Sequence, residues 1–352
     1  GIAQFDNCDY SYYRGLRWLI LLRELFLLLP TFLALSSARR RWGRFDVVHV
    51  NDVTMPFVAW AARHLFPESV VVVHARAVQR VAVSRRRFWL QRLYSECADA
   101  VIAISEHVRD SLPDGLPVRV IHNGMAVPAA PADFESGTPA ADRQFTAAMV
   151  GMLARSKGCL DFVAAAAICR DHGAQIRFEL VGGGLRPRLG IRDRVLALLG
   201  LKEDIGSEIR ALIERLSLQD IVAFRSFTTD LADIYRNIDV LCFPSYLDAP
   251  GRPIFEAGFF GVPSLAAISE PRADTFVLGT TGLVVPPGRP EALAEAILWL
   301  YEHPQERQRM GVAARQMALE RFDAAKNAGI VLDLYRRLLA DRHAAVQGGE
   351  RP

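Results

Sequence analysis

Short runs of valine and isoleucine, separated by helix-like stretches, constrain the fold of this chain more than any other feature. A first group is found at Phe45–Asn51, Ser69–His74, Ala100–Ser105 and Val118–His122. Continuous apolar runs, as opposed to alternating ones, are typical of strands that are buried on both faces of a parallel sheet. Because helical stretches lie between the runs, the pattern predicts repeated strand–helix units.

A second group of such runs follows a stretch rich in proline, alanine, glycine and serine, from Val127 to Ala141, which we interpret as a linker. The strands predicted in this group are Phe145–Val150, Arg177–Val181, Ile221–Phe224, Val240–Phe243, Ser264–Ala267 and Leu283–Val285. Helices are predicted between them, for instance at Asp161–Arg170 and Pro290–Tyr301.

The two groups together predict an α/β fold of two doubly wound, Rossmann-like domains that face each other across a cleft. Such domains bind ligands at the carboxyl ends of their strands. A chain of 352 residues has room for two domains of about 150–200 residues each. We expect a first domain at residues 1–140, a second at residues 141–325, and a C-terminal helix and tail at residues 326–352 that packs back on the first domain.

The apolar segment Trp18–Leu35 admits three interpretations. Arg23, Glu24 and Pro30 interrupt it, whereas a membrane-spanning helix needs about twenty apolar residues with few charges. A buried core helix is the interpretation we favour, ahead of a helix that lies on a membrane face and ahead of a spanning helix.

Charge is unevenly distributed along the chain. The net charge is only +3, yet the stretch from Tyr10 to Ser95 holds fourteen arginines against four acidic residues. An anionic membrane surface as partner and solvated arginines on helix faces both explain this excess. The arginines are not interleaved with stacking aromatic residues, so we expect no nucleic-acid partner.

The five cysteines are scattered along the chain and form no Cys-x-x-Cys pair. This argues against a disulfide framework or a zinc site and favours a reducing cytoplasm. We therefore expect a cytoplasmic protein, with peripheral attachment to the inner face of the membrane as a further alternative.

The segment from Phe243 to Pro263 is the strongest candidate for a binding site. A buried strand is followed by a loop and then by a helix that starts near Pro253, a residue suited to a first helical turn. Free backbone N–H groups at such a helix start can bind a diphosphate. The segment concerned is Gly251, Arg252, Pro253 and Ile254, in which Pro253 itself has no N–H. Glu256, expected inside the first turn, can accept two hydrogen bonds from a ribose diol, and Asp248 can bind sugar hydroxyls. A plain strand–turn–helix with an acid favoured by the helix dipole is the alternative.

Two further glycine loops follow predicted strands. Gly151 opens a loop in which Lys157 is placed as a phosphate-binding charge and Arg155 as a second cation. Gly182 and Gly183 end the next strand, where glycine permits close approach of a ligand. Ordinary surface charges on a loop remain an alternative explanation for both cations.

Taken in order, these pieces resemble the family 4 glycosyltransferases, also called group 1 glycosyltransferases, which are retaining enzymes of the GT-B fold. The resemblance extends from about Phe45 to Tyr335. The matching pieces are Ala98–Ser105, Val120–Gly124, Ser156–Gly158, Leu180–Gly184, Ala232–Val240, Phe243–Ser245, Asp248–Ala257, Gly261–Pro263 and Thr281–Gly288.

The resemblance implies transfer of a sugar from a UDP-, GDP- or similar nucleotide-activated donor to the hydroxyl of a glycan or lipid-linked acceptor, in cell-surface polysaccharide or glycolipid biosynthesis. It implies that the first domain binds the acceptor and the second the donor. Lys157 and a nearby arginine would hold the diphosphate, Glu256 the ribose, and Asp248 the transferred sugar. No metal and no other cofactor is expected.

His74 stands where the family has a histidine near the sugar, so the resemblance places it among the catalytic residues. The preceding strand ends at His49, Asn51 and Asp52, which are weaker candidates to face the same ligand.

Three departures from the family pattern keep other functions open. The family usually has Glu where this chain has Asp248, and often Arg where it has Met152. The opening strand and glycine-rich loop of the first domain are not recognisable before Trp18, so we expect a truncated or degenerate start. These departures allow a non-catalytic sugar-nucleotide-binding protein, or an inactive fragment, as the alternative; a sugar-nucleotide epimerase is the third possibility.

Overall fold

A computed structural model of the chain describes residues 17–82, 84–128, 143–182, 205–226, 228, 230–247 and 250–347. The chain forms two compact units, which are Gly1–Gly124 with Ala324–Pro352 and Met125–Asp323. The domain boundary expected between residues 140 and 141 lies outside the described residues.

The first unit contains a four-stranded parallel sheet in the order β1-β2-β3-β4. Its strands are β1 (Val47–Val50), β2 (Val70–Ala75), β3 (Ala100–Ala103) and β4 (Val118–Val120). All four were predicted, although three end one to two residues earlier than expected and β2 ends one residue later, at Ala75. Strand β2 is buried along its whole length, as its uninterrupted valine run predicts.

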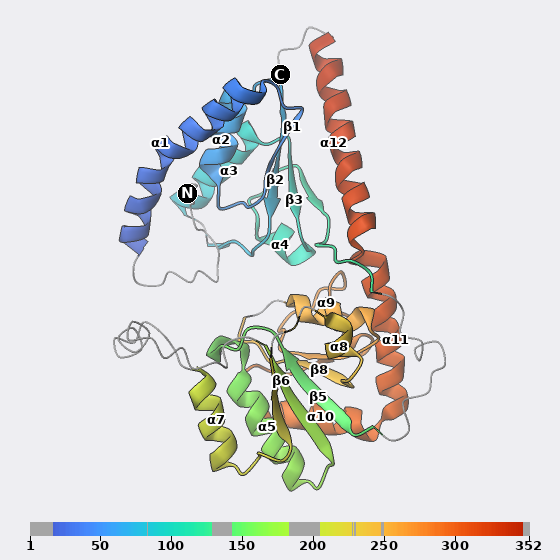
Figure 1. The fold of residues 1–352 in the computed structure, drawn as a ribbon. Coiled ribbons are helices and arrows are strands. Elements are labelled where there is room, and N and C mark those ends of the chain that lie inside the picture. Colours follow the sequence, from blue (N-terminus) through green and yellow to red (C-terminus); the bar gives the residue numbers. More distant parts are fainter. Residues whose placement is uncertain are drawn as a thin grey trace. The chain divides into compact units, whose positions relative to one another are not determined.

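Helices cover both faces of this sheet (Figure 1). On one face, Val71, Val73 and Val101 pack with residues of α2 (Pro56–Leu65) and α3 (Arg85–Cys97). On the other, alternate strand residues such as Val72 pack against α12 (Ala324–Gln347). The short helix α4 (Glu106–Ser111) connects β3 to β4. The C-terminal helix therefore belongs to the first unit.

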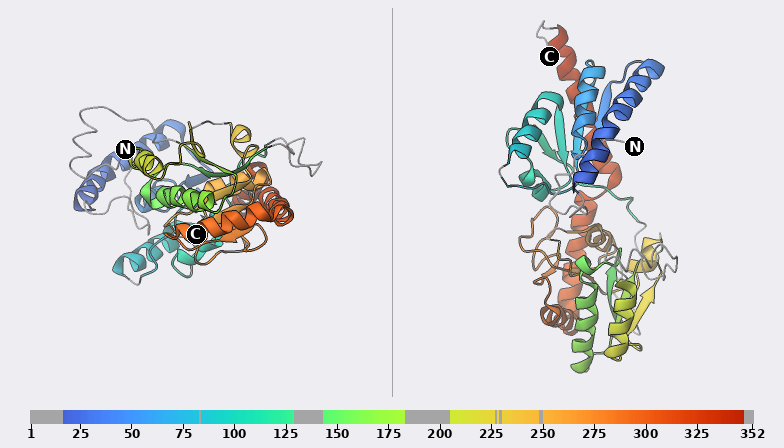
Figure 2. Two further views of the ribbon diagram at one scale, coloured as in Figure 1. Left: turned by 90° about the horizontal axis from the view of Figure 1, so that it is seen from below. Right: turned by 90° about the vertical axis from the view of Figure 1, so that its left-hand side faces the viewer.

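Helix α1 (Arg17–Trp42) lies against α2 and forms an outer layer, which Figure 2 also shows. The prediction of a buried core helix is wrong for this segment. Glu24 and Thr31 are buried, whereas large apolar side chains on the same helix are exposed. The reason is that α2 and α3 already cover the sheet, so only one narrow stripe of α1 finds a packing surface. Within the described residues, no helix combines the length and the apolar character needed to cross a membrane.

The second unit contains a six-stranded parallel sheet in the order β10-β9-β8-β5-β6-β7. Its strands are β5 (Phe145–Val150), β6 (Ile176–Val181), β7 (Val222–Arg225), β8 (Val240–Phe243), β9 (Ser264–Ala266) and β10 (Gly282–Val284). Each corresponds to a predicted strand, and the predicted α/β class is confirmed.

Two layers of helices enclose this second sheet. The helices α5 (Cys159–Asp171), α7 (Ile205–Arg215) and α10 (Pro290–Glu302) share a core on one face. The helices α8 (Leu231–Tyr235), α9 (Arg252–Phe259) and α11 (Pro304–Arg321) contribute to the core on the other. The chain proceeds from β5 outward to β7 and then returns to the other side of β5 with β8. This reversal places a topological switch point between β5 and β8, where open α/β sheets bind ligands.

Candidate active site

A pocket of about 440 Å³ opens at this switch point in the second unit. It brings together four residues that the sequence predicts as donor-binding, namely Gly151, Arg252, Pro253 and Glu256. The remaining lining residues are Val150, Val181, Thr228, Leu231 and Ile234. The pocket wall is therefore mainly apolar, with one buried carboxylate and one arginine as its ionic groups.

Glu256 is the buried carboxylate of this pocket. It is only 7% exposed, and its two oxygens accept hydrogen bonds from different side chains. The Tyr235 hydroxyl donates to Oε2 at 2.9 Å, and Arg252 Nε–H donates to Oε1 at 2.7 Å. Burial, together with the neighbouring Glu256 carboxylate, raises the pKa of Tyr235 well above its usual range, so the hydroxyl remains a donor. The carboxylate is thus held in one orientation.

The expected position of Glu256 inside the first turn of its helix is wrong. Helix α9 starts at Arg252 with Gly251 as its N-cap, so Glu256 is its fifth residue and begins the second turn. Helical side chains tilt toward the helix N-terminus, however, and this tilt brings the carboxylate back to the pocket. The prediction that Pro253 lies in the first turn is confirmed.

Two glycine loops cross at the floor of the site, where β5 and β6 end. Gly151 has a φ of +132°, and its N–H donates to the carbonyl of Val181 at 2.9 Å. A Cβ atom on Gly182 would lie 1.8 Å from the carbonyl oxygen of Gly151, a distance no real contact allows. The crossing therefore requires glycine at position 182.

We expect Gly182→Ala to lower the free energy of unfolding by about 2–3 kcal/mol, because the added methyl group forces the two loops apart. Gly173→Ala is the matched control, since Gly173 also has a positive φ, +77°, but has open space around its Cβ position. The control should cost only the backbone strain, about 1 kcal/mol. Urea unfolding of both variants measures the difference, and equal costs would contradict a steric role for Gly182.

Lys157 closes the short helix η2 (Arg155–Lys157) on the loop after β5. Its Nζ lies 5.2 Å from the centroid of the Phe243 ring, and Gly251 packs on the same ring. Lys157 is thus close to the residue that precedes α9. Burial lowers the pKa of this ammonium group. Within the described part of the chain, the structure shows no carboxylate paired with Lys157, so its charge is available for an anion.

Arg155, predicted as a second diphosphate-binding cation, forms an ion pair with Glu208 on α7. Both side chains are largely exposed. Arg252 is likewise paired with Glu256, with 73% of its side chain exposed. Asp248 and Gly183 lie outside the described residues, so their predicted roles remain predictions.

Tyr235, which lies in the matching segment Ala232–Val240, was not predicted as a site residue. Thr228, Leu231 and Ile234 were also missed as pocket residues. Residues such as Leu231 and Ile234 have an ordinary core pattern, and nothing in their spacing distinguishes a pocket wall from a core. The one available signal was the hydroxyl of Tyr235, because a buried tyrosine hydroxyl needs a hydrogen-bond partner.

In the first unit, the predicted His74 lies near the end of β2 and is 9% exposed. Its Nδ1 is 3.3 Å from Nε2 of His49, and Nδ1 of His49 is 2.5 Å from the Tyr335 hydroxyl. Burial, Arg76 and His49 lower the pKa of His74 to about 4. Arg76 itself binds the backbone and side-chain oxygens of Asn51.

The low pKa of His74 predicts acid sensitivity of the fold. Because the folded pKa of about 4 lies below the ordinary value of 6.5, the unfolded chain takes up the proton first as pH falls. Stability is therefore lost between pH 6.5 and about pH 4, by about 3 kcal/mol in all. In His74→Gln, the free energy of unfolding should decline by correspondingly less over this range. Parallel pH curves for the two proteins would refute a buried neutral His74.

Among the residues that the structure describes, no three or more His, Cys, Asp or Glu side chains are grouped so that they could hold a metal ion.

Comparison with known proteins identifies the family. The model of the group 1 glycosyl transferases matches residues 133–317, more than half of the chain, and that of glycosyltransferase family 4 matches residues 4–127. The chain therefore belongs to the group 1 glycosyltransferases, as the sequence motifs predict.

Individual relatives share only part of their length with this chain. A D-inositol 3-phosphate glycosyltransferase of Paenarthrobacter aurescens is 29% identical over 192 residues, which are 54% of this chain and 43% of that protein. The D-rhamnosyltransferase WbpZ of Pseudomonas aeruginosa is 37% identical over 87 residues, 24% of this chain and 23% of that protein. The chain thus spans less than half the length of these relatives.

Solved structures show the same fold. HepE of Anabaena in complex with UDP superimposes with a TM-score of 0.70 at 21% identity, covering 91% of this chain and 89% of that one. Sucrose-phosphate synthase of Thermosynechococcus elongatus gives a TM-score of 0.70 at 24% identity, with 96% and 83% covered. The predicted GT-B fold is confirmed.

Proposed function

We propose that this protein transfers a sugar from a nucleoside diphosphate sugar to an acceptor hydroxyl, with retention of configuration at the anomeric carbon. The observation that carries the proposal is Glu256, a carboxylate buried in the switch-point pocket and oriented by Tyr235. Membership of the group 1 glycosyltransferases gives the reaction class.

In this proposal the pocket of the second unit binds the nucleoside diphosphate. Glu256 accepts hydrogen bonds from the ribose hydroxyls, in exchange for the exposed Arg252 side chain. Lys157 and the backbone N–H groups of Gly251 and Arg252, at the start of α9, bind the diphosphate. Pro253 has no N–H, and the N–H of Ile254 already donates to the carbonyl of Gly251 at 3.0 Å. Arg155 can join them only by leaving Glu208. Gly151 and Gly182 keep the pocket floor open.

These groups supply the electrostatic stabilisation that the departing diphosphate needs. Negative charge grows on the leaving phosphate as the bond to the sugar breaks, and fixed N–H donors with a nearby ammonium stabilise it without reorganisation. A cation and a helix N-terminus can fill the role that a metal ion has in other transferases, so we propose a metal-independent reaction. Asp248 would bind hydroxyls of the transferred sugar, and we propose His74 as a further substrate-binding residue.

The donor is best sought first among UDP-sugars, because HepE has been solved with UDP-glucose. We propose a glycan or lipid-linked acceptor that binds the first unit, in cell-surface polysaccharide or glycolipid synthesis.

A panel of nucleotide sugars, read by thermal shift, tests the proposal. A true donor binds only the folded chain and raises its midpoint of unfolding. Incubation of that donor with a panel of acceptors should then release nucleoside diphosphate and form a glycoside. Binding without transfer would favour a non-catalytic protein, and isomerised donor in the absence of acceptor would favour an epimerase.

We also propose that the first unit of this otherwise cytoplasmic protein attaches peripherally to an anionic membrane surface. Five large apolar side chains of α1 are at least half exposed and recur at helical spacing: Leu22, Leu25, Phe26, Leu29 and Leu33. Three consecutive arginines, Arg39, Arg40 and Arg41, lie in the last turn of the same helix, where Arg39 is paired with Glu68. An apolar face together with basic residues is the combination that stable peripheral binding requires.

Flotation with vesicles that contain phosphatidylserine should bring the wild-type protein to the lipid fraction at low salt. The double variant Phe26→Ser/Leu29→Ser should stay in the soluble fraction, because it loses the most exposed part of the apolar face. Ile330→Ser, an exposed apolar residue on α12, is the control and should float like the wild type. Wild-type protein that remains soluble with such vesicles would contradict membrane attachment.

A further inference from the structure

The Tyr335 hydroxyl and the rings of His49 and His74 form a series of hydrogen bonds within the first unit. The last ring, that of His74, has a nitrogen that we interpret as a ligand-binding atom. The Tyr335 hydroxyl of α12 contacts His49 Nδ1 on β1, and His49 Nε2 contacts His74 Nδ1 on β2. The other ring nitrogen of His74, Nε2, is buried and has no hydrogen-bond partner among the described residues. A buried polar atom of this kind costs free energy unless something binds it.

The direction of hydrogen-bond donation from residue to residue follows from Tyr335. Within the described residues, His49 is the only hydrogen-bond partner that the structure gives the Tyr335 hydroxyl. If the hydroxyl donates to His49 Nδ1, the one ring hydrogen of neutral His49 is on Nε2. His49 then donates to His74 Nδ1, so the ring hydrogen of neutral His74 is on Nε2. In the reverse direction the tyrosine hydrogen would have no acceptor among the described residues.

The surroundings of the His49 and His74 rings favour their neutral forms. Burial and the positive charge of Arg76 lower the pKa of both His49 and His74. Burial also raises the pKa of Tyr335, so its hydroxyl keeps its hydrogen.

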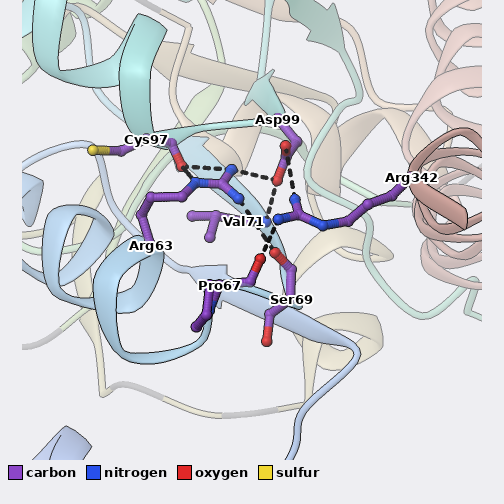
Figure 3. A network of polar contacts seen from close by, with 7 residues as sticks. All are labelled: Arg63, Pro67, Ser69, Val71, Cys97, Asp99 and Arg342. Atoms are coloured by element: carbon purple, nitrogen blue, oxygen red, sulfur yellow. Dashed lines mark hydrogen bonds and ion pairs between the residues drawn. The ribbon is translucent and has the colours of Figure 1, made fainter. Parts of the chain in front are cut away.

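Helix α12 is fixed against the sheet by an ion-pair network to which its residue Arg342 contributes (Figure 3). Arg342 lies seven residues after Tyr335, on the same helix face, and binds Asp99 at 3.4 Å as well as the carbonyl of Pro67. Asp99 also accepts from Arg63 at 2.7 Å and from the backbone N–H of Val71 at 2.6 Å. Between Arg342 and Tyr335, Leu338 and Leu339 pack on the sheet. This anchoring sets the position of the Tyr335 hydroxyl.

We infer that Tyr335 and His49 are positioning residues that fix His74 in the tautomer with its hydrogen on Nε2, so that His74 donates a hydrogen bond to an oxygen atom of the bound substrate. In this state His74 cannot act as a general base through Nε2, because that nitrogen already carries a hydrogen. Its ligand must offer an acceptor, such as a sugar hydroxyl or a phosphate oxygen. The identity of the ligand as a sugar substrate rests on the proposed function, whereas the tautomer does not.

Long-range proton–nitrogen NMR spectra of the full chain labelled with nitrogen-15 test the inference, because a bare and a protonated ring nitrogen differ strongly in chemical shift. Spectra of His49→Gln and His74→Gln assign the two residues. At neutral pH, both wild-type rings should show a bare Nδ1 and a protonated Nε2. In Tyr335→Phe, the Nδ1 signals of both rings should shift together toward the protonated position, as the second tautomer becomes populated.

Leu332→Ala is the matched control, because it removes an exposed apolar side chain of α12 and keeps both the hydroxyl and the anchoring of the helix. Both tautomers should remain unchanged in this variant. A wild-type His74 with its hydrogen on Nδ1 would overturn the inference. Unchanged signals in Tyr335→Phe, or an equal shift in Leu332→Ala, would also overturn it.

A kinetic comparison connects the tautomer to turnover. With an identified donor, Tyr335→Phe should lower kcat about fivefold, the value of one hydrogen bond, with little change in donor KM. The NMR result does not depend on turnover. A failure of the proposed reaction can therefore be distinguished from a failure of Tyr335 and His49 to fix the tautomer of His74.

Discussion

Replacement of Glu256 by alanine should weaken the binding of UDP, or of the true donor nucleotide, by about 100-fold. A carboxylate that accepts two hydrogen bonds from a ribose diol contributes about 3 kcal/mol or more, since bonds to charged groups are worth about 1.5–3 kcal/mol each. The pocket holds no second carboxylate among its described lining residues. Isothermal titration calorimetry with UDP measures the loss directly, and unchanged affinity would remove Glu256 from the site.

Tyr235→Phe provides the control for this prediction. It removes the 2.9 Å hydrogen bond that orients Glu256 but leaves the carboxylate in place. We expect a loss of about tenfold in nucleotide affinity, because a hydrogen bond to a charged group is worth about 1.5 kcal/mol at its weakest and this bond orients the carboxylate without contacting the ligand. Glu256→Gln, which keeps the shape of the side chain, separates the loss of charge from any effect on folding.

Replacement of Lys157 by alanine should lower kcat by about 100- to 1,000-fold. The loss of one preorganised group that stabilises a developing negative charge has this order of magnitude in other enzymes. Lys157 is suited to the role because it lies on the Phe243 ring next to Gly251 and has no described carboxylate partner. Steady-state transfer assays with the donor found in the nucleotide-sugar panel check this expectation.

Arg155→Ala is the matched comparison for Lys157. Arg155 is exposed and already neutralised by Glu208, so its removal should cost far less than that of Lys157. If Arg155→Ala were the more damaging change, the diphosphate would have to recruit Arg155 away from Glu208. Unchanged kcat in Lys157→Ala would exclude the lysine from the leaving-group site.

The strands of both sheets could be predicted from the sequence because their cause is local. A strand such as β2 is buried on both faces, and a short uninterrupted valine run is typical of a central parallel strand. The ends were predicted less accurately: β1 ends at Val50, before Asn51, and β3 ends at Ala103, before Ile104 and Ser105. Helix α1 was misjudged because burial depends on which helices already cover the sheet, and apolar content does not report that.

The candidate site was predictable where backbone geometry dictates the residue. Gly182 is required by a steric contact, and Pro253 by a helix start. Partners that come from distant parts of the chain were not predictable. The sequence does not reveal that Glu208 neutralises Arg155, that Tyr235 orients Glu256, or that Tyr335 reaches His49 across 286 positions. These contacts depend on the packed fold.

The anomeric configuration of the product decides whether the sugar is transferred with retention, as we propose. Proton NMR of the glycoside formed by the full chain, from the donor and acceptor found in the panels, gives this configuration from the coupling of the anomeric proton. We predict the same configuration at the anomeric carbon as in the nucleotide sugar. An inverted product would contradict the account.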